Sequence, residues 1–154
     1  MELHDYHRPV MLSECIEGLD IKPDGIYVDL TFGGGGHSRE ILKRLTSGHL
    51  YGFDQDNDAK QNAESIDSDA FTFVEANFRF LKRYLKMYGV DKVDGVLADL
   101  GISSHQIDDP DRGFSTRFEG DLDMRMDQSA AKSAKEVLNT YSQDALHKIL
   151  GMYG

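Results

Sequence analysis

The sequence predicts an α/β protein with a partial parallel sheet, because short β-prone runs alternate with stretches of helical spacing and a glycine cluster follows the first run. The predicted strands cover residues 26–30, 50–53, 71–75 and 95–98. The predicted helices before and between them cover residues 10–19, 37–45, 58–64 and 78–88. In such an order the crossover helices lie on both faces of the sheet, and ligands bind at the carboxyl ends of the strands.

The first helix is predicted from apolar residues that recur at three- and four-residue spacing after an extended start. These residues are Val10, Met11, Leu12, Cys15, Ile16 and Leu19. Their spacing places them on one apolar helix face, and Cys15, the single cysteine, is expected to pack there. A turn over residues 22–25 then leads into the first strand, since Pro, Asp and Gly favour turns.

A strand, a glycine loop and a helix follow directly. The strand is the β-prone run at 26–30, and the loop contains four consecutive glycines at 33–36. Helical spacing then resumes through Ile41, Leu42 and Leu45. The same alternation of strand and helix continues to the fourth run at 95–98.

The character of the chain changes beyond Asp99. Residues 101–128 are rich in Ser, Asp, Arg, Gly and Met and predict a long functional loop. Two helices are expected after it, the first begun by a capping box of Ser133 and Glu136 and the second begun by Ser142. Because the chain stops four strands into a doubly wound sheet, we expect it to be a fragment of a longer protein.

Composition indicates an ordinary globular protein and restricts what it can bind. With 154 residues, 40% of them apolar, the chain can bury a core. It has neither a run of eighteen apolar residues nor a secretory start, so a cytoplasmic location is expected. Its 17 basic and 27 acidic residues leave a net charge of −10, so any contact with nucleic acid must be local. The six histidines and one cysteine lack zinc-site spacing, and no metal is expected.

The strongest chemical signal combines the glycine loop with Asp54 at the end of the next strand. Glycines let the backbone approach a ligand closely, and a carboxylate about twenty residues later suits ribose hydroxyls, so a nucleoside ligand is predicted. The dinucleotide fingerprint G-x-G-x-x-G fails because Ser38 and Arg39 occupy the positions of its third glycine, and the lysine of a triphosphate loop is missing. The alternatives are a merely flexible turn and an Asp54 that is solvated or caps a helix.

Two longer segments resemble the MraW/RsmH family. They are Ile26–Ser38 and the run Asp99–Ser104, Gln106, Asp108, Asp109, Arg112–Ser115 and Asp121–Asp127. The resemblance extends from His7 to Gly154 and implies a Rossmann-like S-adenosylmethionine methyltransferase fold with a helical domain inserted after the fourth strand. Residues 1–108 would form the amino-terminal part of the methyltransferase domain, and residues 109–154 would begin the inserted substrate-recognition domain.

The activity that the resemblance implies is methyl transfer from S-adenosylmethionine to N4 of a cytidine in small-subunit ribosomal RNA. The expected partner is this RNA within the assembling small subunit, with no membrane and no metal. As a truncated form, the chain is expected to have little activity alone. The alternatives are an NAD-dependent Rossmann oxidoreductase and a non-catalytic fragment that binds cofactor.

The resemblance also implies a set of site residues. The expected cofactor-binding residues are Gly35, Gly36, His37, Asp54, Phe78, Asp99 and Gln106. Asp99 is in addition the expected catalytic residue, because an acceptor beside the amino protons of cytosine turns the nitrogen lone pair toward the methyl group. The alternatives are that Phe78 packs in the core and that Asp99 only caps or binds cofactor.

The predicted loop over residues 101–128 contains two further features. His105 stands where the family usually has proline, and a solvated imidazole is favoured over a general base. Arg112, Arg117 and Arg125 alternate with Phe114 and Phe118, a composition that suits phosphate contact and base stacking. Ion pairs with the neighbouring aspartates are the alternative.

Overall fold

The computed structural model describes residues 9–154, and these form two compact units. The first ends at Gly101 and the second spans Ile102–Gly154. The extended start expected before Val10 lies outside the described residues, as do His4 and His7. The two units are defined only by how compactly their residues pack. The functional boundary expected between residues 108 and 109 therefore stays a prediction.

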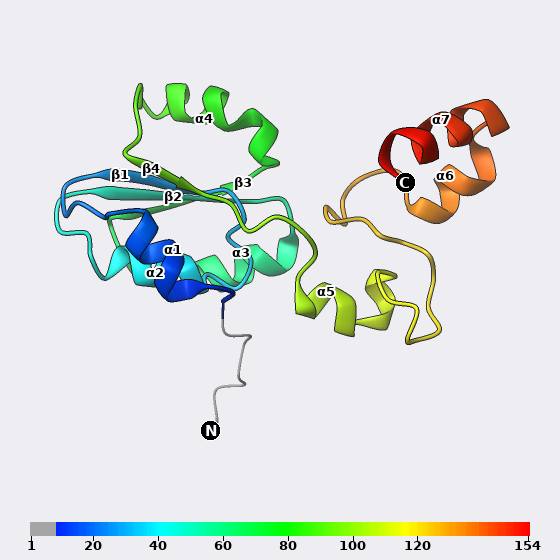
Figure 1. Ribbon diagram of the computed structural model, residues 1–154, viewed down its shortest axis with the longest axis horizontal. Coiled ribbons are helices and arrows are strands. Elements are labelled where there is room, and N and C mark those ends of the chain that lie inside the picture. Colours follow the sequence, from blue (N-terminus) through cyan, green and yellow to red (C-terminus); the bar gives the residue numbers. More distant parts are fainter. Residues whose placement is uncertain (1–8) are drawn as a thin grey trace. The chain divides into compact units, whose positions relative to one another are not determined.

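The first unit is built on a four-stranded parallel sheet, which confirms the predicted α/β class (Figure 1). Its strands are β1 (Ile26–Asp29), β2 (His49–Asp54), β3 (Phe71–Glu75) and β4 (Gly95–Leu97). They lie in the order β3-β2-β1-β4, and every neighbouring pair is parallel. This is the order of the first strands of a doubly wound, Rossmann-like sheet.

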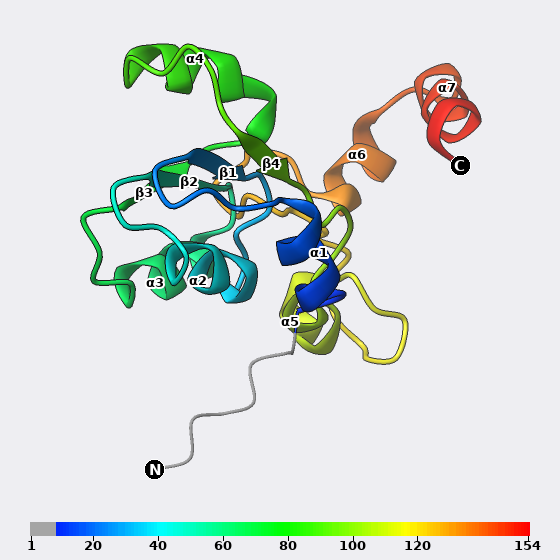
Figure 2. The same ribbon diagram turned by 60° about the vertical axis from the view of Figure 1, so that its left-hand side comes forward.

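Helices cover both faces of this sheet, as the alternating order predicted. On one face lie α1 (Leu12–Gly18), α2 (Gly36–Leu42) and α3 (Asn57–Glu64), and on the other lies α4 (Leu81–Met87), preceded by the 3-10 turn η1 (Phe78–Phe80). The two views of the ribbon agree on this arrangement (Figures 1 and 2).

The core follows from the alternation of side chains along each strand. Tyr27 and Leu50 are buried toward α1 and α2, where they pack with Ile16. Their neighbours Val28 and Tyr51 face the opposite side and pack with Leu85 of α4. Because both faces are covered, the strands read in the sequence as nearly continuous apolar runs.

The first helix differs from its prediction at its start. Met11 has a left-handed backbone with φ of 50°, so α1 begins only at Leu12. Val10 and Met11 are more than half exposed and do not join the predicted apolar face, of which Ile16 is the buried residue. Leu12 and Leu19 pack beside Ile16, and Cys15 is half-buried.

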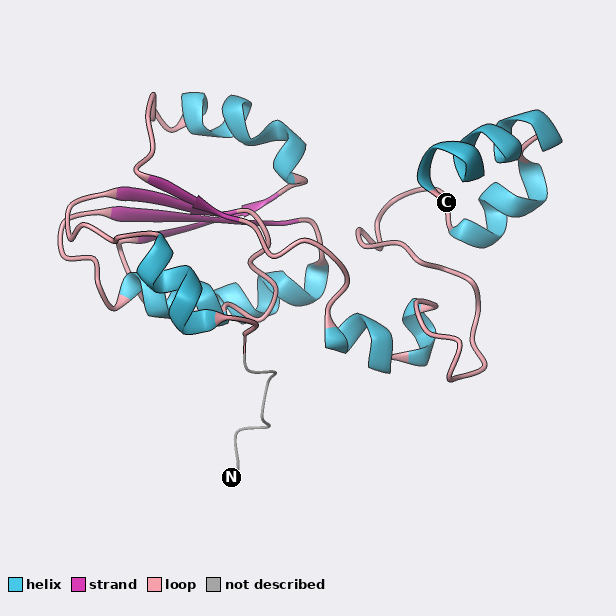
Figure 3. Cartoon of the chain, in the orientation of Figure 1, coloured by secondary structure: helices cyan, strands magenta, loops and turns pink. Residues whose placement is uncertain are grey.

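The second unit contains more helix than the sequence predicted. Its elements are α5 (Ser104–Asp108), η2 (Pro110–Arg112), α6 (Ala134–Thr140) and α7 (Gln143–Tyr153) (Figure 3). The prediction of a loop over 101–128 is wrong at its start, because Ser103 and Gln106 form a capping box that begins α5. The predicted starts of α6 at Ser133 with Glu136, and of α7 at Ser142, are confirmed.

Within residues 9–154, no helix combines the length and the apolar character that crossing a membrane requires.

The central strand β2 should dominate the stability of the first unit. Leu50→Ala removes a side chain that is fully buried against α1 and α2, and we expect it to lower the free energy of unfolding by about 2–5 kcal/mol. Leu100→Ala makes the same chemical change at a position that is 71% exposed, and should cost less than about 0.5 kcal/mol. Urea unfolding followed by circular dichroism measures both. Equal losses would contradict this description of the core.

Candidate functional site

The candidate site lies at the carboxyl edge of the sheet, where the strand order reverses between β1 and β4. Ligands of doubly wound sheets bind at this kind of topological switch point. Acidic residues gather at the edge: Asp29, Asp54 and Glu75 end β1, β2 and β3, and Asp99 stands two residues after β4. The edge is therefore rich in hydrogen-bond acceptors and in negative charge.

Asp54 holds the glycine loop at the tip of β2. One carboxylate oxygen accepts a hydrogen bond from the Gly33 N–H at 2.8 Å, and the other accepts one from the Asp56 N–H at 3.0 Å. Burial raises the pKa of the Asp54 carboxyl above its ordinary value, while the backbone hydrogen bonds oppose the change. Because a carboxylate can accept about four hydrogen bonds, Asp54 retains capacity for a ligand hydroxyl.

The glycine loop is held in one conformation by further contacts. Gly35 has φ of 75°, and a Cβ on it would lie 2.7 Å from the Phe32 ring. A Cβ on Gly36 would overlap the Pro9 ring. The Gly33 carbonyl accepts a hydrogen bond from the Asn62 side chain at 3.1 Å. These contacts favour a glycine loop of defined conformation over a merely flexible turn.

Asp29 is a buried carboxylate under the loop, to which the sequence reasoning assigned no role. Its two oxygens accept hydrogen bonds from the Ser38 hydroxyl at 2.7 Å and from the Thr31 N–H at 3.1 Å. Burial raises the pKa of the Asp29 carboxyl, an effect that the Ser38 hydrogen bond partly offsets. The sequence feature that could have pointed to Asp29 is an aspartate at the end of an apolar strand, because a buried carboxylate needs hydrogen-bond donors close to it.

Asp99 is tied to the same loop through Thr31. The Asp99 N–H donates to the Thr31 hydroxyl at 2.7 Å, and the Leu30 N–H donates to the Leu97 carbonyl at 2.9 Å. The Asp99 residue itself is exposed. The structure therefore brings together Asp54, Asp99 and the glycine loop from three segments of the sequence.

The remaining predicted cofactor residues have different surroundings. The imidazole of His37 is buried, and its Nε2 lies 3.1 Å from the Val10 carbonyl oxygen. Phe78 is 41% exposed at the start of η1, so the alternative that it packs in the core is wrong. Gln106 belongs to the second unit, where its side-chain oxygen accepts a hydrogen bond from the Ser103 N–H at 3.0 Å.

The arginines of the second unit are engaged within that unit. Two nitrogens of Arg125 donate to the Asp123 carboxylate at 2.8 and 2.6 Å. Arg112 is buried and donates to the Arg125 carbonyl at 3.1 Å. Arg117 lies 3.9 Å from an Asp108 oxygen. These contacts favour the alternative of internal ion pairs over phosphate contact for this segment.

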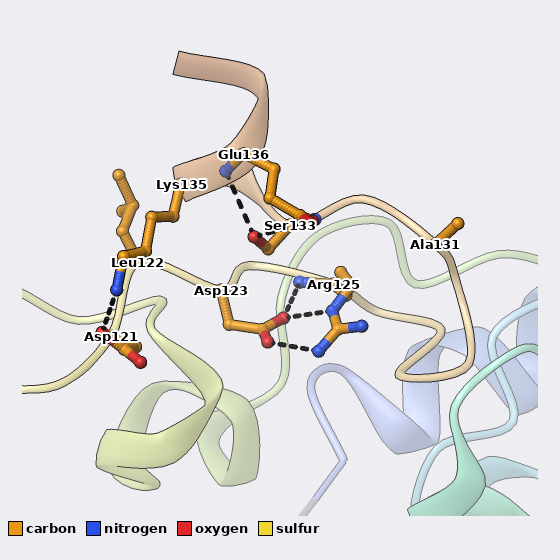
Figure 4. A pocket seen from close by; sticks show the side chains of 8 residues that line it. All are labelled: Asp121, Leu122, Asp123, Arg125, Ala131, Ser133, Lys135 and Glu136. Carbon is orange, nitrogen blue, oxygen red and sulfur yellow. Dashed lines mark hydrogen bonds and ion pairs between the residues drawn. The ribbon is translucent and has the colours of Figure 1, made fainter. Parts of the chain in front are cut away.

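Similar contacts lie along the wall of a polar hollow of about 280 Å³ in the second unit (Figure 4). It is lined by Asp121, Leu122, Asp123, Arg125, Ala131, Ser133, Lys135 and Glu136. Figure 4 shows Arg125 directed at Asp123 and Lys135 directed at Asp121, and these cations and carboxylates neutralise each other. None of the predicted site residues lines this hollow.

Metal-binding side chains do not cluster in the described part of the chain. Within residues 9–154 there is no group of three or more His, Cys, Asp or Glu side chains that could hold a metal ion.

The buried carboxyl of Asp29 should make stability depend on pH. Its pKa is raised in the folded state, so the stability that it contributes is present below about pH 3.8 and is lost as pH rises through the raised pKa. Asp29→Asn stays neutral and can accept from Thr31 while donating to Ser38. We therefore expect the variant to gain stability relative to the unaltered chain as pH rises, by about 1.4 kcal/mol per pH unit between the two pKa values. Urea unfolding from pH 4 to pH 8 measures the difference, and a difference that shrinks with pH would contradict it.

Comparisons with known proteins show the family of the chain. A model of the MraW methylase family matches residues 4–154. The chain is 62% identical over 149 residues to the ribosomal RNA small subunit methyltransferase H of Cytophaga hutchinsonii, covering 97% of the chain and 50% of that relative. The proteins of the same name from Christiangramia forsetii and Parabacteroides distasonis are 58% and 60% identical over 154 and 151 residues, which cover 99% and 97% of the chain and 50% and 49% of those relatives. The chain thus spans about half the length of the curated relatives it matches, and it belongs to the MraW methylase family.

Proposed function

We propose that this protein takes part in methyl transfer from S-adenosylmethionine to N4 of a cytidine in small-subunit ribosomal RNA. The observation that carries the proposal is the carboxyl edge of the sheet, where Asp54 fixes the glycine loop and Thr31 fixes Asp99. Family membership and the printed names of the relatives support the reaction class and the RNA substrate. Because the proposed substrate is ribosomal RNA, we expect the reaction to take place in the cytoplasm.

The chemistry of the edge fits S-adenosylmethionine better than a dinucleotide. The bound cofactor supplies an activated methyl group on a positively charged sulfonium, together with an adenine and a ribose. Asp54 and Asp99 offer negative charge and acceptors to a sulfonium, an ammonium and ribose hydroxyls. The G-x-G-x-x-G fingerprint of NAD sites fails here because Ser38 and Arg39 occupy the positions of its third glycine, so the oxidoreductase alternative loses support.

Five residues of the first unit divide the work of holding the cofactor. Asp54 accepts hydrogen bonds from ribose hydroxyls at the tip of β2, and the exposed ring of Phe78 stacks on the adenine. Backbone atoms of Gly35 and Gly36 line the cofactor, and substitution at either glycine would displace the loop from its packing. His37 contributes by holding the loop against Val10, since its ring is buried there.

Asp99 acts on the amino group of the cytidine. The N4 lone pair is delocalised into the ring, so the amine is a poor nucleophile until an acceptor orients its protons. The Asp99 carboxylate serves as this acceptor, and the hydrogen bond from its N–H to Thr31 fixes the backbone that carries it. For Gln106, a role near the amino acid or reaction end rests on the family resemblance alone.

Cofactor binding tests the proposed role of Phe78. We expect Phe78→Leu to weaken binding of S-adenosylhomocysteine to the 154-residue chain by about 0.5–1.5 kcal/mol, because the aromatic face is lost. Phe80→Leu is a matched control, since Phe80 is 39% exposed and lies two residues away. Isothermal titration calorimetry with each variant, and with NAD, measures the effects. Tight binding of NAD, or equal losses in the two variants, would contradict the proposal.

A chimera tests the reaction itself. In it, residues 1–154 replace the matching half of the Cytophaga hutchinsonii relative, which is 62% identical to this chain. We expect the chimera to transfer labelled methyl groups to the RNA of isolated small subunits, and N4-methylcytidine to appear in the digested RNA. Asp99→Asn should slow transfer roughly 100-fold or more.

Two outcomes would contradict this assignment. An inactive chimera beside an active parent would favour the non-catalytic alternative for this chain. A normal rate with Asp99→Asn would remove Asp99 from the reaction. The 154-residue chain alone, assayed in parallel, measures how much activity these residues have by themselves.

A further inference from the structure

The helix α4 and the preceding turn η1 carry two opposed faces. Leu81, Tyr84 and Leu85 point toward the sheet and pack with the core that contains Val28 and Phe53. The basic residues of the segment are Arg79, Lys82, Arg83 and Lys86, all of them exposed. Their spacing of three, one and three residues places them along one side of a helix, away from the core. This side is called the α4 basic face below.

The α4 basic face is an exception in an acidic protein. Residues 76–90 contain no acidic residue, although the whole chain has a net charge of −10. Four other basic residues of the first unit pair with carboxylates, among them Lys22 with Asp94 and Lys60 with Glu75. Within residues 9–154, no ion pair is formed by Lys82, Arg83 or Lys86, and Arg79 lies over the Phe80 ring at 4.6 Å.

We propose that the α4 basic face binds the phosphate backbone of the RNA substrate. The inference rests on the proposed function and names the surface of the first unit on which the RNA docks. Cations spaced along one helix side neutralise successive phosphates, whereas the acidic remainder of the chain repels them. The face begins directly after Phe78, so RNA bound there lies next to the segment that the proposed function assigns to the cofactor.

A membrane surface is the less suitable partner for these charges. Basic amphipathic helices bind membranes by burying their apolar side among the lipids. The apolar side of α4 is already buried in the protein core through Leu85 and its neighbours. Only the charges remain available, and these suit a polyanion in solution.

Two triple variants of the 154-residue chain test the inference. The first, Lys82→Gln with Arg83→Gln and Lys86→Gln, removes three cations from the α4 basic face. The control, Lys22→Gln with Lys43→Gln and Arg44→Gln, removes two lysines and one arginine that pair with Asp94 or Glu40. Both variants change the net charge equally. Fluorescence anisotropy with labelled small-subunit ribosomal RNA, at several salt concentrations, measures binding.

We expect the α4 variant to bind RNA about tenfold more weakly or worse, with the slope of log affinity against log salt reduced by about 2–3. The control should bind within about threefold of the unaltered chain, because its cations are already engaged by carboxylates. Both variants should bind S-adenosylhomocysteine as the unaltered chain does, which also verifies that they fold.

Several results would overturn the inference. These are equal loss of RNA binding in both variants, no loss in the α4 variant, and no RNA binding by the unaltered chain. Stronger binding of the unaltered chain to vesicles of anionic lipid than to RNA would assign the face to membranes instead. Calorimetry keeps this test separate from that of the proposed function: lost RNA binding with intact cofactor binding concerns the α4 basic face alone.

Discussion

The hydrogen bond from the Gly33 N–H to the Asp54 carboxylate is the contact on which the candidate site depends. It joins the loop after β1 to the tip of β2, and the loop in turn holds two further carboxylates. Asp29 bridges Thr31 and Ser38 beneath the loop, and Thr31 holds the backbone of Asp99. The parallel sheet makes this possible, because it brings the carboxyl ends of all four strands to one edge. Acceptors from distant parts of the sequence therefore meet around one loop.

The distribution of charge separates two tasks in the first unit. Carboxylates concentrate at the edge of the sheet, which is where we propose that a cationic cofactor with ribose hydroxyls binds. Unpaired cations concentrate on the outer side of α4, where they form a surface suited to a polyanion. In a chain of net charge −10 such a surface has to be local, and α4 offers one whose apolar side is already used by the core. Cofactor and RNA can thus be held by neighbouring but chemically different surfaces.

The second unit uses its charges for its own structure. Arg125 and Asp123 form a double hydrogen bond, Arg112 is buried among backbone carbonyls, and Lys135 pairs with Asp121. An irregular segment without a large apolar core gains its order from such contacts and from helix caps, as at Ser103 and Ser133. A sequence that alternates arginine with aromatic residues is therefore not by itself a sign of RNA contact.

The sequence alone determined the strands, most helices and the glycine loop, because local spacing and β-propensity act over a few residues and the tertiary fold here agrees with them. It also predicted two candidate site residues, Asp54 from its spacing after the glycine loop and Asp99 from the family resemblance. It could not show that the Thr31 hydroxyl supports Asp99, since that hydrogen bond joins two residues that only the sheet brings together. Nor could it separate paired from unpaired cations: the sequence left open whether Arg125 contacts phosphate or a neighbouring aspartate, and only the folded chain shows its pair with Asp123. Pairing is a property of three-dimensional distance, and composition does not contain it.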